Sequence, residues 1–370
     1  MRFSEFSGEW EETTLGKISE ITKGGGISKD QLSEQGSPCI LYGELYTKYK
    51  SEIIDEVYSR TELDSSSLVK SKANDVIIPC SGETAIDIST ARCVLFNNIL
   101  LGGDLNIIRL KHDDGGFFAY QLNGTRKKDI ARVAQGVSVV HLYGESLKHI
   151  RVYHPAIEEQ KKIARLLSLI DERIATQNKI IEDLKKLKSA IAETIFNAVQ
   201  GRIAILSTIC SVIKGKQVNG EELLEKGEYY VMNGGVTPSG YYDQYNTPAE
   251  TISISEGGNS CGYVQYNKPP FWSGGHCYTL QDIDKEVDNQ YLFHYLKQCE
   301  SSIMNLRIGT GLPNIQKKDL ENFRIILPPS IKQKEIATCL TAIEDKIGIE
   351  VHWLACVQKE KQHLLRQMFI

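Results

Sequence analysis

The chain has 370 residues, a length that predicts two or three domains, each large enough to bury its own core. Its formal net charge of −4 disfavours a protein that coats nucleic acid by charge alone, but allows a reader that keeps its basic groups in one cleft or shares DNA with partner subunits. The nine cysteines form no Cys-x-x-Cys pair, so we expect reduced thiols and no metal site. The first residues are too polar for a signal peptide, and no apolar run approaches the roughly 20 residues of a membrane span. We therefore expect a cytoplasmic protein without membrane contact.

Residues 1–154 are predicted to form a first α+β globule. Strand-like apolar runs, separated by glycine, proline and polar clusters, are clearest at residues 76–78, 93–96, 105–110 and 150–153. Shorter helical patterns open at residues 115–123 and 145–148. The mixture of short strands and short helices indicates an α+β domain.

A long helix is predicted over residues 155–200. Pro155 stops the preceding strand, and Glu158 and Glu159 lie in the first turn, where a helix favours acidic side chains. Apolar residues then recur at steps of four and three until the pattern ends near Gly201. This spacing, sustained over several turns, is typical of a coiled-coil seam rather than of a surface helix.

The pattern then begins again, so residues 201–327 predict a second globule and residues 328–370 a second long helix. At a constant offset of 191, Leu15, Ile18, Ile21, Lys23, Gly24, Leu32 and Gly36 correspond to Leu206, Ile209, Val212, Lys214, Gly215, Leu223 and Gly227. Gly102 and Gly103 fall near Gly274 and Gly275 at an offset of 172, and from Gly136 onward the offset is 173. The order globule, helix, globule, helix indicates an internal repeat.

The two helices share even the polar interruptions of their seams. Gln177 and Lys188 interrupt the first, and Glu350 and Lys361 interrupt the second at the same places. The predicted seam residues are Ile163, Leu167, Ile170, Ile174, Gln177, Ile181, Leu184, Lys188, Ile191 and Ile195, then Ile336, Leu340, Ile343, Ile347, Glu350, Leu354, Val357, Lys361, Leu364 and Met368. In an antiparallel pair with Lys188 opposite Glu350, Gln177 faces Lys361, and such buried polar pairs fix register. The alternative is that all four side chains are exposed to solvent.

The ends of the two globules match, whereas their interiors differ. One interpretation is a single scaffold that presents two different surfaces, as a reader of two unlike targets needs. The other is an old duplication whose loops have drifted. The residues alone leave both interpretations open.

Among the matches to catalytic motifs, residues 258–262 fit the G-x-S-x-G pattern. That chemistry needs a strand, a sharp turn and a helix. Residues 263–266 instead predict a strand that runs into Pro269, so we expect a hairpin turn. There is no glycine-rich phosphate loop either, and the chain is predicted to be a non-catalytic binding subunit.

Several motifs resemble one known family. Two motifs carry the resemblance. The first is the N-terminal pattern of Arg2, Phe3, Phe6, Gly8 and Trp10, and the second is a Pro-x-x-x-x-Gln-x-x-Ile signature at Pro155, Gln160 and Ile163, repeated at Pro328, Gln333 and Ile336. Both motifs resemble those of the specificity (S) subunits of type I restriction-modification enzymes. The resemblance covers the whole chain.

The resemblance implies two α+β target-recognition domains, joined and spaced by two long antiparallel coiled-coil helices with a pseudo-twofold internal repeat. Each domain would read one half of a split asymmetric site in double-stranded DNA. Two methylation (M) subunits would dock on the helices, with restriction (R) subunits in the full complex. S-adenosylmethionine, ATP and Mg²⁺ would then belong to these partners, which carry out adenine methylation and cleavage, and this chain would hold no cofactor.

Candidate DNA contacts are basic residues that bind phosphates, together with polar or aromatic groups that can meet bases. They are Lys23, Arg126, Lys127, Lys128, Arg132, Ser138 and His141 in the first globule, and Lys214, Tyr241, Tyr242, Arg307, Asn314, Lys317 and Lys318 in the second. Residues 135–141 and 309–314 are polar loops at matching places. Ordinary solvated surface is the alternative for the basic residues, a simple connecting loop for the loop residues, and core packing for the tyrosines.

Two other functions are compatible with the sequence. One is a coiled-coil scaffold protein without DNA binding, and the other is the recognition subunit of another multisubunit restriction enzyme. An electrophoretic shift that competes only with DNA of one split sequence, and weakens as salt rises, separates the scaffold from the DNA readers.

Overall fold

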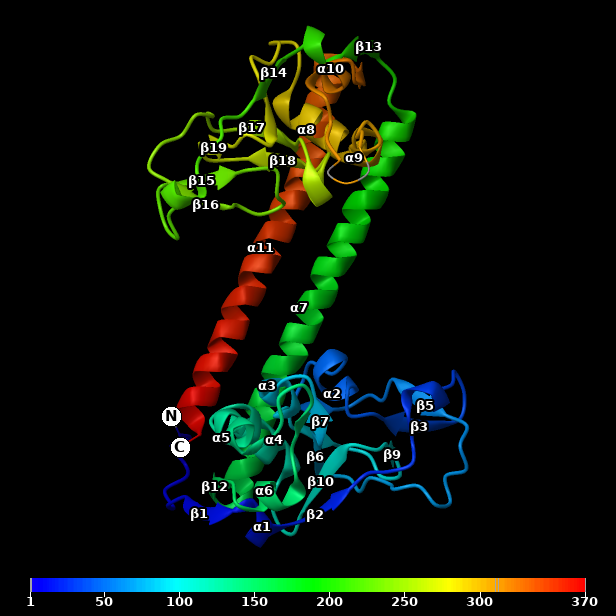
Figure 1. Ribbon diagram of the computed structural model, residues 1–370, viewed down its shortest axis with the longest axis vertical. Coiled ribbons are helices and arrows are strands. Elements are labelled where there is room, and N and C mark those ends of the chain that lie inside the picture. Colours follow the sequence, from blue (N-terminus) through cyan, green and yellow to red (C-terminus); the bar gives the residue numbers. More distant parts are fainter. Residues whose placement is uncertain (1, 310, 312, 370) are drawn as a thin grey trace. The chain divides into compact units, whose positions relative to one another are not determined.

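The computed structural model describes residues 2–309, 311 and 313–369, and it divides into two compact units. Unit 1 contains the residues up to Lys179 and those from His352 onward, and unit 2 contains Ile180–Val351. Each unit therefore combines one globule with a part of each long helix (Figure 1).

The globule of unit 1 mixes short strands with short helices. Its strands are β1 (Glu11–Thr14), β2 (Ser19–Lys23), β3 (Ser37–Ile40), β4 (Ile53–Ile54), β5 (Ser59–Thr61), β6 (Asp75–Pro79), β7 (Ser81–Gly82), β8 (Arg92–Val94), β9 (Leu100–Leu101), β10 (Leu105–Leu110), β11 (Val140–His141) and β12 (Arg151–His154). Its helices are α1 (Leu15–Ile18), η1 (Lys29–Gln31), α2 (Glu44–Thr47), α3 (Ala85–Ile88), α4 (Gly115–Asn123), α5 (Lys127–Val133) and α6 (Gly144–Lys148). The sheet orders are β2-β10-β6-β8-β4, β5-β3-β9, β1-β12 and β11-β7.

The central strands of unit 1 are buried on both faces. Along β6, Val76 and Ile78 lie in one apolar cluster, whereas Ile77 lies in another. This is the twofold alternation expected of a pleated strand, and it explains why β6 is apolar throughout its middle. The first cluster also contains Phe117 of α4, whose backbone N–H is capped by the Asp114 carboxylate at 2.8 Å.

The globule of unit 2 repeats this plan. Its strands are β13 (Arg202–Ile205), β14 (Ser211–Lys214), β15 (Tyr229–Met232), β16 (Gly240–Tyr242), β17 (Thr251–Ser255), β18 (Val264–Asn267), β19 (Trp272–Ser273), β20 (Cys277–Gln281) and β21 (Arg324–Leu327). Its helices are η2 (Leu206–Thr208), η3 (Gly220–Glu222), η4 (Gly258–Ser260), α8 (Asn289–Gln298), α9 (Glu300–Met304) and α10 (Lys317–Glu321). The sheet orders are β14-β20-β17-β18, β16-β15-β19 and β13-β21.

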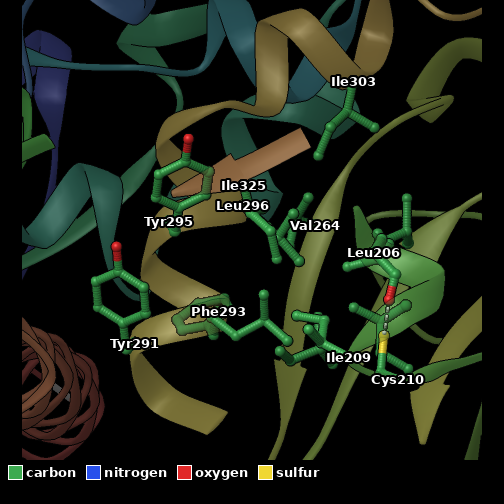
Figure 2. Packing of buried hydrophobic residues seen from close by; sticks show 14 of the residues in the cluster. Leu206, Ile209, Cys210, Val264, Tyr291, Phe293, Tyr295, Leu296, Ile303 and Ile325 are labelled. Atoms are coloured by element: carbon green, nitrogen blue, oxygen red, sulfur yellow. Dashed lines mark hydrogen bonds between the residues drawn. The ribbon is translucent and has the colours of Figure 1, made fainter. Parts of the chain in front are cut away.

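The core of unit 2 is formed where α8 covers the four-stranded sheet. Figure 2 shows Phe293 and Leu296 of α8 beside Val264 of β18, together with Ile209. Tyr291, also on α8, is fully buried, and its hydroxyl donates to the Ile326 carbonyl at 2.7 Å. The ring of this tyrosine is thus buried without leaving its hydroxyl unpaired.

The two long helices are α7 (Ile157–Ala198) and α11 (Ser330–Met368). None of the predicted seam residues is exposed, and several, such as Leu167 and Leu340, are fully buried. Within unit 1, Asp171 contacts Lys361 and the later Arg173 contacts the earlier Trp353, so the helix segments run antiparallel there. The α+β fold class expected from the sequence is confirmed.

The predicted pairing of the polar seam residues is wrong. Lys188 forms an ion pair with Glu344 at 3.1 Å, and Lys361 forms one with Asp171 at 2.5 Å. Each acid lies six residues before the predicted partner, Glu350 or Gln177. The physical reason in unit 1 is a second carboxylate, since Glu52 of the globule also binds Lys361 at 2.6 Å. The helix pattern alone contains no information about that residue.

The alternative, exposure of all four polar seam residues, does not hold either. Gln177 is 2% exposed, and the side chains of Lys188 and Lys361 are 20% and 12% exposed. Both lysines therefore form ion pairs within their own units, and the pair at Lys361 is enclosed, whereas Glu344, the partner of Lys188, is 44% exposed.

Candidate nucleic-acid interface

The two Lys-Gly dipeptides that correspond in the repeat lie at the ends of equivalent strands. Lys23 ends β2 in unit 1, and Lys214 ends β14 in unit 2. A Cβ atom at Gly24 would lie 2.2 Å from the carbonyl oxygen of Gly102, and one at Gly215 would lie 2.2 Å from that of Gly274. No side chain fits at such distances, so the glycines that match in the sequence are those that let two loops touch in each unit.

In unit 1, three backbone hydrogen bonds lie beside this close approach of the two loops, and we call this set of bonds frame 1. Gly24 N–H donates to Leu105 O at 2.9 Å, Cys80 N–H donates to Asp104 O at 2.6 Å, and Leu142 N–H donates to Cys80 O at 2.7 Å. Frame 1 joins the ends of β2 and β6 to the start of β10. It fixes the backbone at positions 80 and 104 next to Lys23.

Unit 2 contains the same set of bonds, which we call frame 2. Gly215 N–H donates to Cys277 O at 2.9 Å, Glu256 N–H donates to His276 O at 2.9 Å, and Ile315 N–H donates to Glu256 O at 2.8 Å. Positions 256 and 276 thus correspond to positions 80 and 104. The backbone hydrogen bonds agree, whereas the side chains differ.

Frame 1 presents an acidic acceptor. Asp104 is exposed and has a left-handed backbone with φ of 56°, which aspartate tolerates better than most residues. The Ser81 hydroxyl donates to its Oδ2 atom at 3.1 Å. Beneath it, burial raises the pKa of the Cys80 thiol to about 11, with a lowering contribution from Lys23 and a raising one from Asp104. The thiol is therefore protonated and serves as packing, not as a reactive group.

Frame 2 presents a histidine and a lysine on a buried carboxylate. Lys214 Nζ lies 2.6 Å from Glu256 Oε1, and His276 Nδ1 lies 3.7 Å from Glu256 Oε2. Glu256 is 7% exposed, whereas the side chains of Lys214 and His276 are 51% and 65% exposed. The Tyr278 hydroxyl, whose pKa is raised by burial, lies 3.1 Å from Oε1. The acid therefore orients two groups that face solvent.

The polar loops predicted at matching places adjoin the two frames. In unit 1, β11 pairs with β7, which sets the exposed His141 opposite Ser81. In unit 2, Asn314 bridges to Gly257, the residue after Glu256. His141 thus adjoins the frame that follows Lys23, and Asn314 adjoins the frame that follows Lys214. Ser138 is exposed in the first loop, while Thr310 and Leu312 of the second lie outside the described residues.

The basic cluster of the first globule is largely engaged within the protein. Arg126 lies over the Tyr153 ring at 5.1 Å, and Arg132 pairs with Asp129 at 2.9 Å. Lys127 donates to Thr90 at 3.2 Å, and its pKa is lowered by burial and by the nearby Arg92. Lys128 is exposed, as are Arg307, Lys317 and Lys318 in the second globule, where Lys317 also lies 3.5 Å from Glu321.

The two predicted tyrosines lie on a different sheet from frame 2. Tyr241 and Tyr242 are on β16 and are half-buried. The Tyr242 ring meets Trp272 edge to face, with 4.9 Å between centroids, and its hydroxyl lies 3.4 Å from Glu222. These contacts stabilise the β16-β15-β19 sheet.

The G-x-S-x-G match is a hairpin turn, as expected. The chain passes from β17 through the short η4 turn into the antiparallel β18, so no helix follows Ser260. Over the described part of the chain, no group of three or more His, Cys, Asp or Glu residues is placed to hold a metal ion. None of the described helices is long and apolar enough to cross a membrane.

Four residues of the frames were missed by the sequence predictions: Cys80, Asp104, Glu256 and His276. A signal for two of them exists, because Asp104 and His276 directly follow the matching glycine pairs at the same offset of 172. Positions 80 and 256 correspond at a different offset, so only the backbone hydrogen bonds reveal them.

A duplicated α+β fold with two long helices is the architecture of DNA specificity subunits, and comparison with protein families agrees. The model of the type I restriction modification DNA specificity domain matches residues 7–186 and 205–357, one match for each copy of the repeat. The chain belongs to this family. The resemblance noted from the sequence motifs is thereby confirmed.

Individual relatives carry the same description. A type I restriction enzyme specificity subunit of Methanocaldococcus jannaschii is 28% identical over 285 residues, which are 67% of this chain and 66% of the relative. A type I specificity subunit of Mycoplasma genitalium is 23% identical over 268 residues, 68% of this chain and 70% of the relative. The chain thus aligns with about two thirds of the length of these relatives.

Solved structures show the same fold over the whole chain. The crystal structure of a type I restriction-modification S subunit from M. genitalium has a TM-score of 0.74 at 19% identity, and covers 100% of this chain and 99% of that chain. A structure that describes complex assembly and conformational transition of the type I R-M system has a TM-score of 0.57 at 15% identity, with 98% and 97% covered.

Proposed function

We propose that this chain is the DNA-recognition subunit of a type I restriction-modification complex and reads a bipartite site, one half with each unit. The observation that carries the proposal is the pair of frames. Each sets a lysine, which can hold a phosphate, beside side chains of different chemistry, which can meet different bases. One scaffold with two unlike surfaces is what reading two unlike half-sites requires.

The partners follow from the family. Two M subunits dock on this chain and methylate adenine with S-adenosylmethionine, and R subunits add ATP- and Mg²⁺-dependent cleavage in the cytoplasm, where the cell's DNA lies. This chain supplies recognition and no catalysis, and it binds no cofactor itself. Support comes from its membership in the specificity-domain family and from the related structure described as part of a complex assembly.

Sequencing of methylated adenines tests the proposal directly. Cells that express the M subunits with this chain should carry methylation at one split sequence, and cells without this chain should lack it. Methylation that is independent of the chain, or a purified chain that methylates or cuts DNA alone, would contradict the proposal. An electrophoretic shift of the assembled complex, competed only by DNA of that split sequence, excludes a scaffold that does not touch DNA.

A further inference from the structure

We propose that Asp104 and His276 are specificity-determining residues, each contacting one base of its half-site, and that Ser81 and Glu256 position them. The proposal rests on the proposed DNA-recognition function and adds the residues that carry the readout. Of these four residues, none belongs to the basic clusters that the sequence suggested.

The two frames are equivalent in their backbone hydrogen bonds. Because Cys80 N–H donates to Asp104 O and Glu256 N–H donates to His276 O, positions 104 and 276 occupy the same place in the fold. Both are exposed, and both follow a pair of glycines. The two positions differ in side chain and in backbone conformation, since Asp104 has a left-handed φ of 56° whereas His276 has no positive φ, so each unit presents a different group at the same place in the fold.

A lysine adjoins each of the two positions and can bind a DNA phosphate there. Lys23 and Lys214 end the equivalent strands β2 and β14 next to these positions. A lysine ammonium binds a DNA phosphate without regard to sequence and so sets the register of the protein on the duplex. In unit 2 the connection is direct, since Glu256 contacts Lys214 with one oxygen and faces His276 with the other.

The chemistry of Asp104 selects a class of base. An ionised carboxylate only accepts hydrogen bonds. In the major groove the groups that donate are the exocyclic amines, N4 of cytosine and N6 of adenine. The Ser81 hydroxyl engages Oδ2 and holds the carboxylate in place. Asp104 thus reads a base that presents an amino group.

The chemistry of His276 is different, because a buried acid lies behind it. Its Nδ1 atom faces Glu256, so the contact to DNA is made by Nε2. Glu256 Oε2 is buried and, among the described residues, accepts no hydrogen bond. A buried acceptor without a donor costs free energy, and a small movement of the His276 ring would supply one. DNA binding is therefore expected to shorten the distance between His276 and Glu256.

Methylation of a DNA library by the complex of this chain with its M subunits tests the assignment. Three variants are compared with wild type: Asp104→Asn, His276→Gln and Glu256→Gln. Asp104→Asn should reduce the preference for one base in one half-site by roughly tenfold or more, and His276→Gln should do so in the other half-site. Glu256→Gln should change the same base position as His276→Gln, as expected for a positioning residue.

Matched controls separate readout from binding and folding. Lys23→Ala should weaken binding of all sequences and lower its salt dependence, with base preferences retained. Co-purification with the M subunits checks that every variant is folded. If Asp104→Asn and His276→Gln keep every wild-type base preference in a folded complex, or lower methylation equally at all sequences, the inference is wrong and the proposed function stands. If the wild-type chain directs no methylation, the proposed function itself fails.

Discussion

At the scale of single residues, Lys361 is an enclosed charge on the long helix α11 within unit 1. Its ammonium binds Glu52 at 2.6 Å and Asp171 at 2.5 Å, and the Tyr120 hydroxyl donates to Asp171 at 2.7 Å. The side chains of Lys361 and both acids are at most 12% exposed. Removing one member leaves charges without a partner in a poorly solvated place.

We therefore expect Lys361→Ala to destabilise unit 1 by about 3 kcal/mol, the typical cost of breaking a buried pair by deleting one partner. Urea unfolding measures the change in midpoint. Arg165→Ala is the matched control, since Arg165 pairs with Glu172 at 2.9 Å in unit 1 but with both side chains well exposed. The control should unfold as the wild type does. Equal stability of the two variants would show that the Lys361 cluster is not a stabilising element.

The second prediction concerns His294, a buried residue of α8. Burial, together with the nearby Lys188, lowers its pKa from 6.5 to about 3, and its Nε2 atom lies 2.9 Å from the Thr341 hydroxyl. Between pH 6.5 and about 3 the unfolded chain binds a proton at this residue that the folded unit does not. Stability is thus complete above pH 6.5 and falls with pH through this window, by about 1.4 kcal/mol per pH unit from this group alone.

His294→Gln should remove this contribution, so the free energy of unfolding should depend less steeply on pH between 6.5 and 3. Urea titrations at a series of pH values provide the measurement. Thr341→Val serves as the control, because it removes a hydrogen-bond partner without removing a titrating group and should lower stability equally at every pH. An unchanged slope for His294→Gln would contradict the buried neutral state.

At the scale of elements, the loops that meet at the frames depend on glycine. Gly24→Ala should destabilise unit 1 by about 1–3 kcal/mol, the usual cost of overpacking, because the new Cβ would overlap Gly102 O at 2.2 Å. Gly25→Ala is the neighbouring control, since nothing lies within 4 Å of its Cβ position. Thermal unfolding of the two variants compares them, and a similar melting temperature for both would refute the steric requirement.

The central elements of the first globule could be predicted from the sequence, and their bounds agree closely with β6, β10, β12, α4 and α6. These elements have long apolar runs or clear caps, so local pattern suffices. β8 ends at Val94 and not at Phe96, because Leu95 and Phe96 are exposed. The β5-β3-β9 sheet was not foreseen, since its strands have only 2–4 residues and form through long-range pairing.

The candidate interface could be predicted only in part. Lys23, Lys214 and the two polar loops stand next to the frames, because the repeat marks them in the sequence. Cys80 and Glu256 could not be found in this way, because insertions in the middle of the globules change the offset. Only the hydrogen-bonded backbone shows that they occupy one place.

At the scale of the whole molecule, the chain is two copies of one plan, and each copy contains an ion pair between its segments of the two long helices. Lys361 in unit 1 and Lys188 in unit 2 correspond in the repeat, and each binds the repeat-equivalent acid, Asp171 or Glu344. The residue that adjoins the acid differs, Tyr120 in one unit and His294 in the other. The heptad pattern predicted which residues would be enclosed but not their partners, because the pattern is compatible with several registers.

A prediction about helix length follows from the proposed function. Insertion of seven residues into both α7 and α11 adds about 10.5 Å to each helix and nearly preserves the face of the seam. The gap of the methylated site should then grow by about three base pairs, at about 3.4 Å each. Sequencing of methylated adenines reads the gap. Insertion into one helix alone should disrupt assembly, whereas an unchanged gap after the double insertion would exclude a spacing role.

The close contacts of Gly24 with Gly102 and of Gly215 with Gly274 also limit which substitutions the chain can accept during evolution. A Cβ atom at Gly24 or Gly215 would overlap a backbone carbonyl oxygen, so these two codons are closed to drift. The neighbouring position 276 is open to substitution, because its exposed side chain takes no part in the backbone bonds that hold it, whereas the left-handed φ at position 104 favours aspartate, asparagine or glycine. A single nucleotide change at codon 276 can therefore create a new DNA preference without passing through a misfolded ancestor.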